Sequence, residues 1–355
     1  MNDSQPVISC RNVWKVFGSR ASEALSAIRK EGVGKAEVLR RFQCVVGVAD
    51  ATFDVQRGEI FCIMGLSGSG KSTLLRHINR LIDPSDGSIL IDGREINKLN
   101  AAELRALRAE KIAMVFQSVA LLPYRTVLEN AALGLEFRKV PKPARLEAAK
   151  RALEAVQLGD WINRYPSDLS GGMLQRVGLA RALASDSPIL LMDEPFSALD
   201  PLIRRELQIQ FVELSRAFRK TTVFITHDLE EAVRVGNRIG IMRDGVMVQI
   251  GAPEEIVMAP ADDYVSRFTA GIAKNHLVSA RSLMTPVPEI DAAKLEALPR
   301  VAASADIDQL IGLFLSNENG ALAVESENGQ LIGRVTQSDL LRGIRGPKTT
   351  AASGG

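Results

Sequence analysis

Cysteine, histidine and tryptophan are scarce in this sequence, which has three, three and two of them among 355 residues. Cys10, Cys44 and Cys62 are widely spaced and form no CxxC pair, so a disulfide scaffold is excluded. The same spacing, with so few histidines, argues against a structural zinc site. We expect three free, mostly buried thiols in a reducing compartment.

Long apolar runs and an excess of one charge are also missing. No run approaches the roughly 18 apolar residues that a membrane-spanning helix needs, and MNDSQPVISC lacks the pattern of a secretory signal. The formal charge is only +2, whereas nucleic-acid binders usually carry a larger or more clustered basic excess. With 46% hydrophobic and 24% charged residues, the composition excludes disorder over most of the chain.

The order of predicted elements indicates an α/β protein. Strands that alternate with helices imply a mainly parallel sheet with crossover helices. Predicted strands cover residues 7–17, 45–55, 59–64, 88–93, 111–117, 187–195 and 221–227. A hairpin is predicted at 238–251 around Asp244-Gly245. Apolar residues at helical spacing predict two short amphipathic helices within 19–43 and another helix at 143–158.

A glycine-rich segment, GLSGSGKS at residues 65–72, matches the P-loop pattern GxxxxGK[ST] between a predicted strand and a predicted helix. Glycines let backbone N–H groups converge on phosphate oxygens, and the helix N-terminus favours an anion there. Lys71 can bridge the β- and γ-phosphates, and the Ser72 hydroxyl can hold Mg²⁺. The predicted phosphate-binding residues are Gly65, Leu66, Ser67, Gly68, Ser69, Gly70, Lys71, Ser72 and Thr73.

Two further segments complete the predicted site. The apolar run ILLMD ends in Asp193, whose carboxylate can reach the Mg²⁺ hydration shell, and Glu194 is placed to orient an attacking water. Ser170, Gly171 and Gly172 precede a helical run and form a second anion-binding nest. A plain strand end and a capped helix start are the alternatives for these segments. A chain with one P-loop rarely needs a second phosphate nest of its own.

In this order, the P-loop, the Ser-Gly-Gly nest and the Asp-Glu strand end resemble the ATP-binding subunit of ABC transporters. The resemblance covers about residues 7–272. Met173 stands where the family usually has Gln, and this departure is similar to the importers of quaternary amines. The insert at 19–43 and the segment MGLSGSGKSTLLRHINRLIDP also resemble the glycine betaine/proline/choline subgroup.

The resemblance implies roles for residues outside these three motifs. Phe17 takes the adenine-stacking position, although the family more often has Tyr there and a core aromatic is the alternative. Gln117 matches the Q-loop residue, which coordinates Mg²⁺ and couples to the membrane subunit. Asp200 ends the D-loop SALD, and His227 matches the switch histidine that senses the γ-phosphate.

The predicted site residues therefore fall into three sets. The catalytic residues are Lys71, Glu194 and His227. The Mg²⁺ ligands are Ser72, Gln117 and Asp193. ATP is contacted, beyond the P-loop, by Phe17, Gln117, Ser170, Gly171, Gly172 and Asp200. His77 and His276 lack such context and are expected to be structural or on the surface.

The resemblance also implies partners and a function. In the family, the P-loop of one subunit and the nest of its partner clamp one ATP, which implies a homodimer with two composite sites. The implied function is ATP hydrolysis, at the cytoplasmic face of the inner membrane, that powers import of a quaternary ammonium or related compatible solute such as glycine betaine, choline or proline. The implied partners are a membrane permease and an extracytoplasmic solute-binding protein, without nucleic acid. An amino-acid importer ATPase and a soluble ABC ATPase acting on DNA or ribosomes are the alternatives.

The expected architecture has an ATPase domain at 1–272 and a small C-terminal unit. The ATPase domain comprises a P-loop NTPase core with a mainly parallel sheet, an antiparallel β subdomain, and an ABC helical subdomain at about 100–185. Residues 280–345 resemble a single cystathionine-β-synthase-type (CBS) repeat, an α+β unit, through LMTP at 283–286 and GRVTQSDL at 333–340. A degenerate dimerisation appendage without ligand is the alternative, and residues 346–355 are predicted to be disordered.

Overall fold

The chain divides into two compact units, Met1–Ile250 and Gly251–Gly355. The computed structural model describes residues 5–197, 199–270, 279–287, 295–317, 319–326 and 328–345. The division falls earlier than the predicted boundary at 272, because Met258 packs against the core of the second unit. His276, Ala198 of the D-loop and the predicted tail 346–355 lie outside the described residues.

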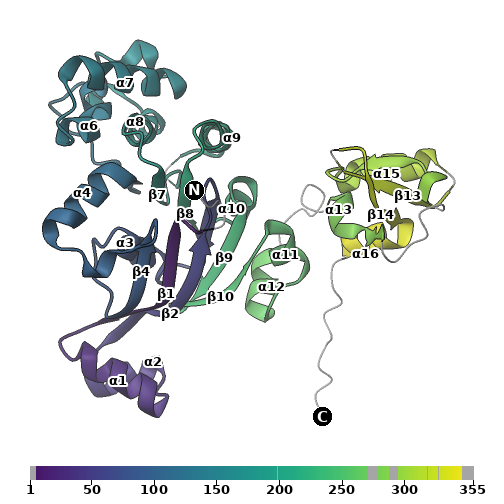
Figure 1. Ribbon diagram of the computed structural model, residues 1–355, viewed down its shortest axis with the longest axis horizontal. Helices are drawn as coiled ribbons and strands as arrows, with labels where there is room; N and C mark the ends of the chain where they lie inside the picture. The colour runs from purple at the N-terminus through teal and green to yellow at the C-terminus, as the bar shows by residue number, and fades with distance from the viewer. Residues whose placement is uncertain are drawn as a thin grey trace. The chain divides into compact units, whose positions relative to one another are not determined.

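An antiparallel sheet of four strands forms one layer of the first unit (Figure 1). The strand Val45–Val55 largely alternates between buried and more exposed residues, as expected for a sheet with one face on the core. This confirms the predicted antiparallel β subdomain. In sheet order the strands are β2 (Val45–Val55), β1 (Ile8–Phe17), β4 (Asp86–Ile91) and β5 (Arg94–Glu95).

A mainly parallel sheet of six strands forms the second layer (Figure 1). In sheet order its strands are β10 (Val246–Gly251), β9 (Arg238–Arg243), β3 (Ile60–Met64), β8 (Thr221–Thr226), β7 (Ile189–Asp193) and β6 (Ile112–Val115). Every residue of β3, β7 and β8 is buried, which explains their continuous apolar runs. One core cluster joins both sheets to α3 (Lys71–Ile78).

The register of the parallel strands places their carboxyl ends at one edge. Met64 of β3 pairs with Thr226 of β8, and Asp193 of β7 pairs with Ile225 of the same strand. The residues that follow these strands therefore emerge side by side. Ligands of open parallel sheets bind at this edge, so the sheet itself brings the sequence motifs together.

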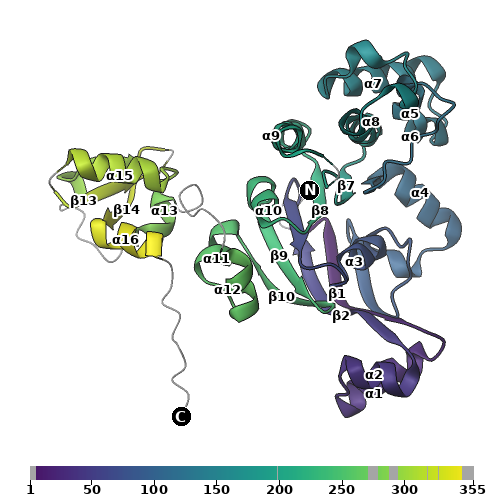
Figure 2. The same ribbon diagram turned by 180° about the vertical axis from the view of Figure 1, so that it is seen from behind.

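Helices cover the large sheet and form one end of the first unit (Figures 1 and 2). Strand β6, at an edge of the large sheet, lies within the expected range of the helical subdomain and matches the strand predicted at 111–117. The helices of this unit after α3 are α4 (Ala101–Lys111), α5 (Val127–Ala131), α6 (Leu133–Phe137), α7 (Lys142–Ala155), α8 (Gly171–Ala184), α9 (Pro201–Ala217) and α10 (Leu229–Val235), with short 3₁₀ turns at Ile96–Lys98, Gly159–Trp161 and Pro166–Asp168.

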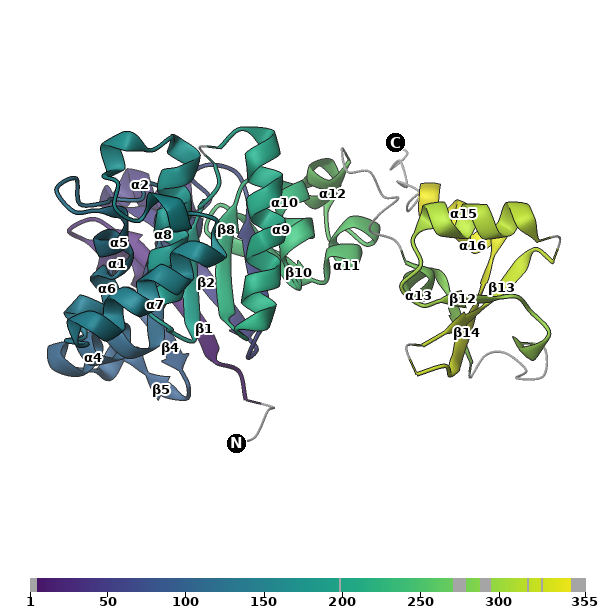
Figure 3. The ribbon, with the colours of Figure 1, turned by 90° about the horizontal axis from the view of Figure 1, so that it is seen from above.

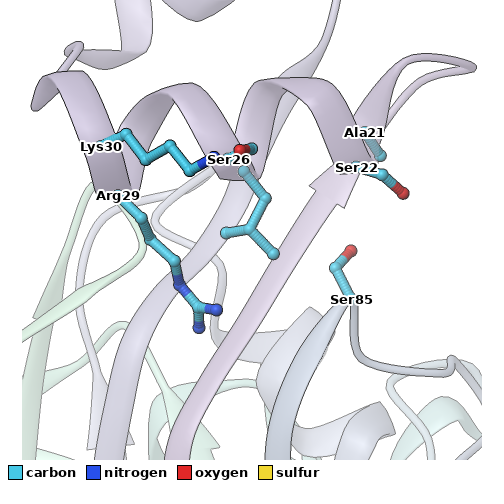
Figure 4. A pocket seen from close by; sticks show the side chains of 7 residues that line it. Ala21, Ser22, Ser26, Arg29, Lys30 and Ser85 are labelled. Carbon is cyan, nitrogen blue, oxygen red and sulfur yellow. The ribbon is translucent and has the colours of Figure 1, made fainter.

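The insert between β1 and β2 forms the two predicted helices, α1 (Ala21–Glu31) and α2 (Lys35–Phe42). Their apolar faces share a separate small core with β1 and β2. An ion pair between Arg29 and Asp86 ties α1 to β4. Beside it, a surface hollow of about 480 Å³ lies between α1 and Ser85 (Figure 4).

The second unit is a small α+β fold with a sheet in the order β11, β14, β13, β12. From Arg300 to Arg345 its elements follow the order strand, helix, strand, strand, helix, as expected of an α+β unit. Its elements are α11 (Pro253–Met258), α12 (Asp263–Thr269), α13 (Ala280–Leu283), β11 (Thr285–Pro286), β12 (Arg300–Ala302), α15 (Ile307–Ser316), β13 (Ala321–Glu325), β14 (Leu331–Thr336) and α16 (Gln337–Arg345).

The cysteines are free and buried, as the sequence predicts. Cys10, Cys44 and Cys62 are free and buried, and burial raises the pKa of the Cys10 and Cys62 thiols. His77 is buried too, as expected for a structural histidine. Over the described ranges, none of the helices combines the length and the apolar character that crossing a bilayer requires.

Candidate active site

The P-loop joins β3 to α3 and fits tightly between its neighbours. Gly65, Gly68 and Gly70 all have positive φ angles, of 154°, 79° and 100°. A Cβ on Gly65 would lie 2.1 Å from the Met242 carbonyl oxygen, and one on Gly70 would lie 2.2 Å from the Gly47 carbonyl oxygen. Only glycine fits these two positions, so the loop conformation depends on its composition.

Because of this crowding, we expect alanine substitution to destabilise the protein by different amounts at two glycines of the loop. We expect Gly70→Ala to lower the free energy of unfolding by about 3 kcal/mol or more, because it adds a backbone clash to the strain of a left-handed residue. Gly68→Ala is the matched control, since its Cβ meets no atom within 4 Å and the left-handed strain alone costs about 1–2 kcal/mol. Urea unfolding of both variants measures the difference, and equal losses would contradict this account of the loop.

Lys71 folds back over the loop at the start of α3. Its Nζ donates hydrogen bonds to the Gly65 carbonyl at 2.8 Å and the Leu66 carbonyl at 3.0 Å. Burial lowers the pKa of this amine, against the opposing effect of the nearby Glu194 and Asp193 carboxylates. The ammonium group therefore lies at the centre of the loop, where a phosphate would meet it.

A hydroxyl and a carboxylate meet beside Lys71. Ser72 Oγ donates a hydrogen bond to Asp193 Oδ1 at 2.7 Å, and Arg76 lies 3.5 Å from the other carboxylate oxygen. Mg²⁺ takes hard oxygen ligands and commonly uses one or two protein groups with water and substrate phosphates. The donor set of Ser72 and Asp193 fits that ion. Gln117 is exposed two residues after β6, and its side chain is not part of this pair.

Glu194 and His227 form the second pair at this edge. His227 Nδ1 lies 3.1 Å from Glu194 Oε2, within hydrogen-bonding distance. Glu194 has a φ of 45°, the left-handed region that a side chain of this size rarely adopts, and its N–H donates to the Ile225 carbonyl. Such strain is characteristic of functional positions. The pair is accessible, since the side chain of His227 is 57% exposed.

The aromatic ring of Phe17 lies near the P-loop and the start of α3. Phe17 is 40% exposed, and Lys15 Nζ lies 5.1 Å from its ring centre. A Cβ on Gly47 would lie 2.7 Å from the Phe17 ring and 3.7 Å from the Thr73 methyl group. The ring is therefore next to α3, as an adenine-stacking residue would need to be, and is not buried in a core.

The Ser-Gly-Gly nest lies at the N-terminus of α8. Ser170 caps this helix, because its hydroxyl accepts a hydrogen bond from the Met173 N–H. A Cβ on Gly172 would contact Leu199 at 3.3 Å, and Asp200 borders the same hollow of about 460 Å³. The nest thus adjoins the D-loop, whereas Lys71, Ser72, Asp193, Glu194 and His227 gather at the sheet edge.

Sequence patterns did not indicate several residues of this site. Gly47 contacts both the P-loop and Phe17, but it is an isolated glycine in a strand, a weak signal of close backbone approach. Arg76 of α3 contacts Asp193, and Arg176 of α8 lines the hollow beside the nest. Their helical spacing in the sequence is the same as that of arginines that face solvent. Trp161, which lines the nest hollow together with Arg176, comes from a segment that carries no motif.

Comparisons with known proteins agree with this geometry. A family model described as ABC transporter matches residues 48–197. The chain is 46% identical over 325 residues to the glycine betaine/proline betaine transport system ATP-binding protein ProV of Escherichia coli K12, covering 90% of this chain and 81% of that protein. It is 42% identical to the trimethylamine N-oxide transport system ATP-binding protein TmoW of Pelagibacter ubique, covering 96% of this chain and 98% of that protein.

A solved structure shows the same fold. The dimeric post-hydrolysis state of the ATP-binding cassette MJ0796, bound to ADP and Pi, matches with a TM-score of 0.59 and 32% sequence identity. The match covers 69% of this chain and 98% of that chain.

The fold and the paired motifs define a P-loop ATPase of the ABC class. The chain belongs to the family of ABC-transporter ATP-binding subunits, in the group with the glycine betaine, choline and trimethylamine N-oxide transport proteins. It is accordingly an ATP-binding and ATP-hydrolysing subunit that works with a membrane permease, and cassettes of this class form dimers.

Proposed function

We propose that two copies of this chain bind ATP between the P-loop of one copy and the Ser-Gly-Gly nest of the other, and that hydrolysis powers solute import. The convergence of Lys71, the Ser72–Asp193 pair and the Glu194–His227 pair at one sheet edge carries this proposal. The nest supports the dimer, because it adjoins the D-loop rather than the P-loop of its own chain.

The residues divide the work of phosphoryl transfer by their positions. Lys71 and the P-loop N–H groups hold the β- and γ-phosphates, while Phe17 stacks on the adenine. Ser72, Asp193 and Gln117 would hold Mg²⁺, which supplies neutralisation of phosphate charge when bound. Glu194 orients the attacking water, and His227 contacts the γ-phosphate oxygen. Catalysis then rests on positioning and electrostatics, since little covalent chemistry is needed from the protein.

The permease docks, in our proposal, on an open hollow of about 630 Å³ beside Gln117. Its lining is mostly apolar and includes Arg105, Arg108 and Arg181, which suits an amphipathic helix. Phe137, at this hollow, is 76% exposed and has the solvent contact expected of an uncovered docking residue. The hollow is lined by residues of α4, β6, α6 and α8, among them Arg105, Leu133, Phe137 and Arg181, and by Phe116, which follows β6.

Docking there would hold the chain at the cytoplasmic face of the inner membrane, and an extracytoplasmic solute-binding protein would deliver the solute. The C-terminal residues 280–345 would act as a single CBS-like regulatory unit. The strand–helix–strand–strand–helix order from Arg300 to Arg345 and the separate core support an independent unit.

A quaternary ammonium or related compatible solute is the proposed cargo, because the relatives named above are transport proteins for glycine betaine, proline betaine and trimethylamine N-oxide. The test uses the chain with its permease and binding protein in proteoliposomes. We expect glycine betaine, choline or proline to raise ATP hydrolysis several-fold over solute-free vesicles. Stimulation only by α-amino acids other than proline would instead favour an amino-acid importer.

A further inference from the structure

A ring of contacts surrounds the Glu194–His227 pair, and one residue closes it. The Glu194 carbonyl accepts hydrogen bonds from Ser197 Oγ at 3.0 Å and from the Ser197 N–H at 3.3 Å. Arg204 Nη2 donates to the Leu199 carbonyl at 2.9 Å and lies 3.5 Å from the Ser197 carbonyl. The guanidinium of Arg204 thus holds the backbone that follows Glu194.

The other side of the same guanidinium meets the segment that carries His227. Arg204 Nη1 lies 3.6 Å from Asp228 Oδ2, and Asp228 directly follows His227. Asp228 is fixed in turn, because its N–H donates to Thr226 Oγ1 at 2.9 Å and its carboxylate caps α10. The ring therefore runs from Glu194 through Ser197, Arg204 and Asp228 to His227, and returns across the 3.1 Å contact of the pair.

The helices behind Arg204 are held together, so the guanidinium projects from a fixed frame. Helices α9 and α10 lie side by side (Figures 1 and 3). One turn beyond Arg204, the buried Gln208 donates from Nε2 to the buried Glu231 at 2.9 Å, and Arg234 donates to Gln208 Oε1 at 2.7 Å.

The D-loop residues that Arg204 contacts lie beside the Ser-Gly-Gly nest. Arg204 lies one helical turn after Asp200, and the backbone N–H of Arg204 donates to the Asp200 carbonyl at 2.9 Å. Leu199 and Asp200 border the same hollow as the nest. A change in this segment on nucleotide or partner binding would therefore reach Glu194 and His227 through Arg204.

We propose that Arg204 is a positioning residue for ATP hydrolysis, which joins the D-loop backbone to the His227 turn and so fixes Glu194 and His227 relative to one another. Arg204 touches neither side chain of the pair. The planar guanidinium suits this task, since its fork binds backbone carbonyls and a carboxylate at once, whereas a lysine ammonium is a single point charge. The proposal rests on the proposed function, in which Glu194 and His227 act in hydrolysis.

The test measures steady-state hydrolysis of Mg-ATP by the full chain as a function of ATP concentration, which gives kcat and KM, and records the thermal unfolding midpoint of each variant. We expect Arg204→Ala and Arg204→Lys to lower kcat by about 10- to 100-fold, the scale of a small misplacement of catalytic groups, with KM within about twofold. Arg204→Lys keeps the positive charge and the helix, so it tests the need for the planar guanidinium even if Arg204→Ala folds poorly. Arg205→Ala, at the exposed next position of α9, is the matched control and should leave kcat unchanged.

A double-mutant cycle separates positioning from general stability. In a His227→Ala background, we expect Arg204→Ala to lower kcat by less than about twofold further, since a residue that acts through the pair has no pair left to position. A full additional loss there, or a wild-type kcat in both Arg204 variants, overturns the inference while leaving the proposed function intact. If His227→Ala and Glu194→Gln themselves hydrolyse ATP at the wild-type rate, the proposed function fails, and the inference with it.

Discussion

Glu194→Gln is expected to bind Mg-ATP and to dimerise, yet to hydrolyse ATP on the order of 10²- to 10⁴-fold more slowly than the wild-type chain. The amide has nearly the shape of the carboxylate and can still accept a hydrogen bond from His227 Nδ1, which lies 3.1 Å from the present oxygen. It cannot polarise a water as a carboxylate does. Single-turnover hydrolysis measures the chemical step, and equilibrium dialysis measures nucleotide binding.

A matched control separates this effect from a general loss of charge. Glu213 is exposed on α9, and Glu213→Gln changes the net charge by the same amount. Its hydrolysis rate should equal that of the wild-type chain. Hydrolysis by Glu194→Gln within about threefold of wild type would remove Glu194 from the mechanism, because general-base effects are much larger than that.

A mixture of two inactive variants is expected to regain activity. Lys71→Met disables the P-loop, where Nζ bonds the Gly65 and Leu66 carbonyls, and loss of such a charge costs on the order of 10²- to 10³-fold. Gly171→Asp disables the nest by placing a negative charge where a phosphate would bind. The added side chain has room, because a Cβ on Gly171 meets no atom within 4 Å. Each variant alone should therefore fold and be nearly inactive.

The composite site explains why mixing restores hydrolysis. In a dimer of one Lys71→Met and one Gly171→Asp chain, one site carries both defects and the other has an intact P-loop and an intact nest. With random pairing, about a quarter of all sites are intact, since half of the dimers are mixed. Steady-state hydrolysis of the equimolar mixture measures this recovery. A mixture no more active than the separate variants would contradict a site shared between two copies, and a control mixture of Lys71→Met with itself should stay inactive.

The sequence predicts the elements of the site well where local pattern and burial agree. The apolar runs at β3, β7 and β8 are continuous because both faces of the sheet are covered, so their ends are visible in the sequence. Because these strands are parallel neighbours, the residues after them meet at one edge. That geometry brings Lys71, Asp193, Glu194 and His227 together, as the motif order indicates.

Other features depend on contacts between distant segments, which local pattern does not encode. Arg204 contacts Asp228 because α9 packs on α10. The periodicity of the sequence does not distinguish an arginine that makes such a contact from one that faces solvent. Gly47 is needed for the approach of Phe17 and the P-loop, both far from it in sequence. The division after Ile250 likewise follows from tertiary packing.

The central claim is that ATP hydrolysis at this edge drives solute import, and coupled uptake tests it most directly. The measurement uses proteoliposomes that contain the chain and its permease, with the binding protein and labelled glycine betaine on one side and ATP on the other. The account predicts ATP-dependent accumulation with the wild-type chain and none above background with Glu194→Gln. Equal accumulation with both chains, or accumulation without ATP, would contradict it.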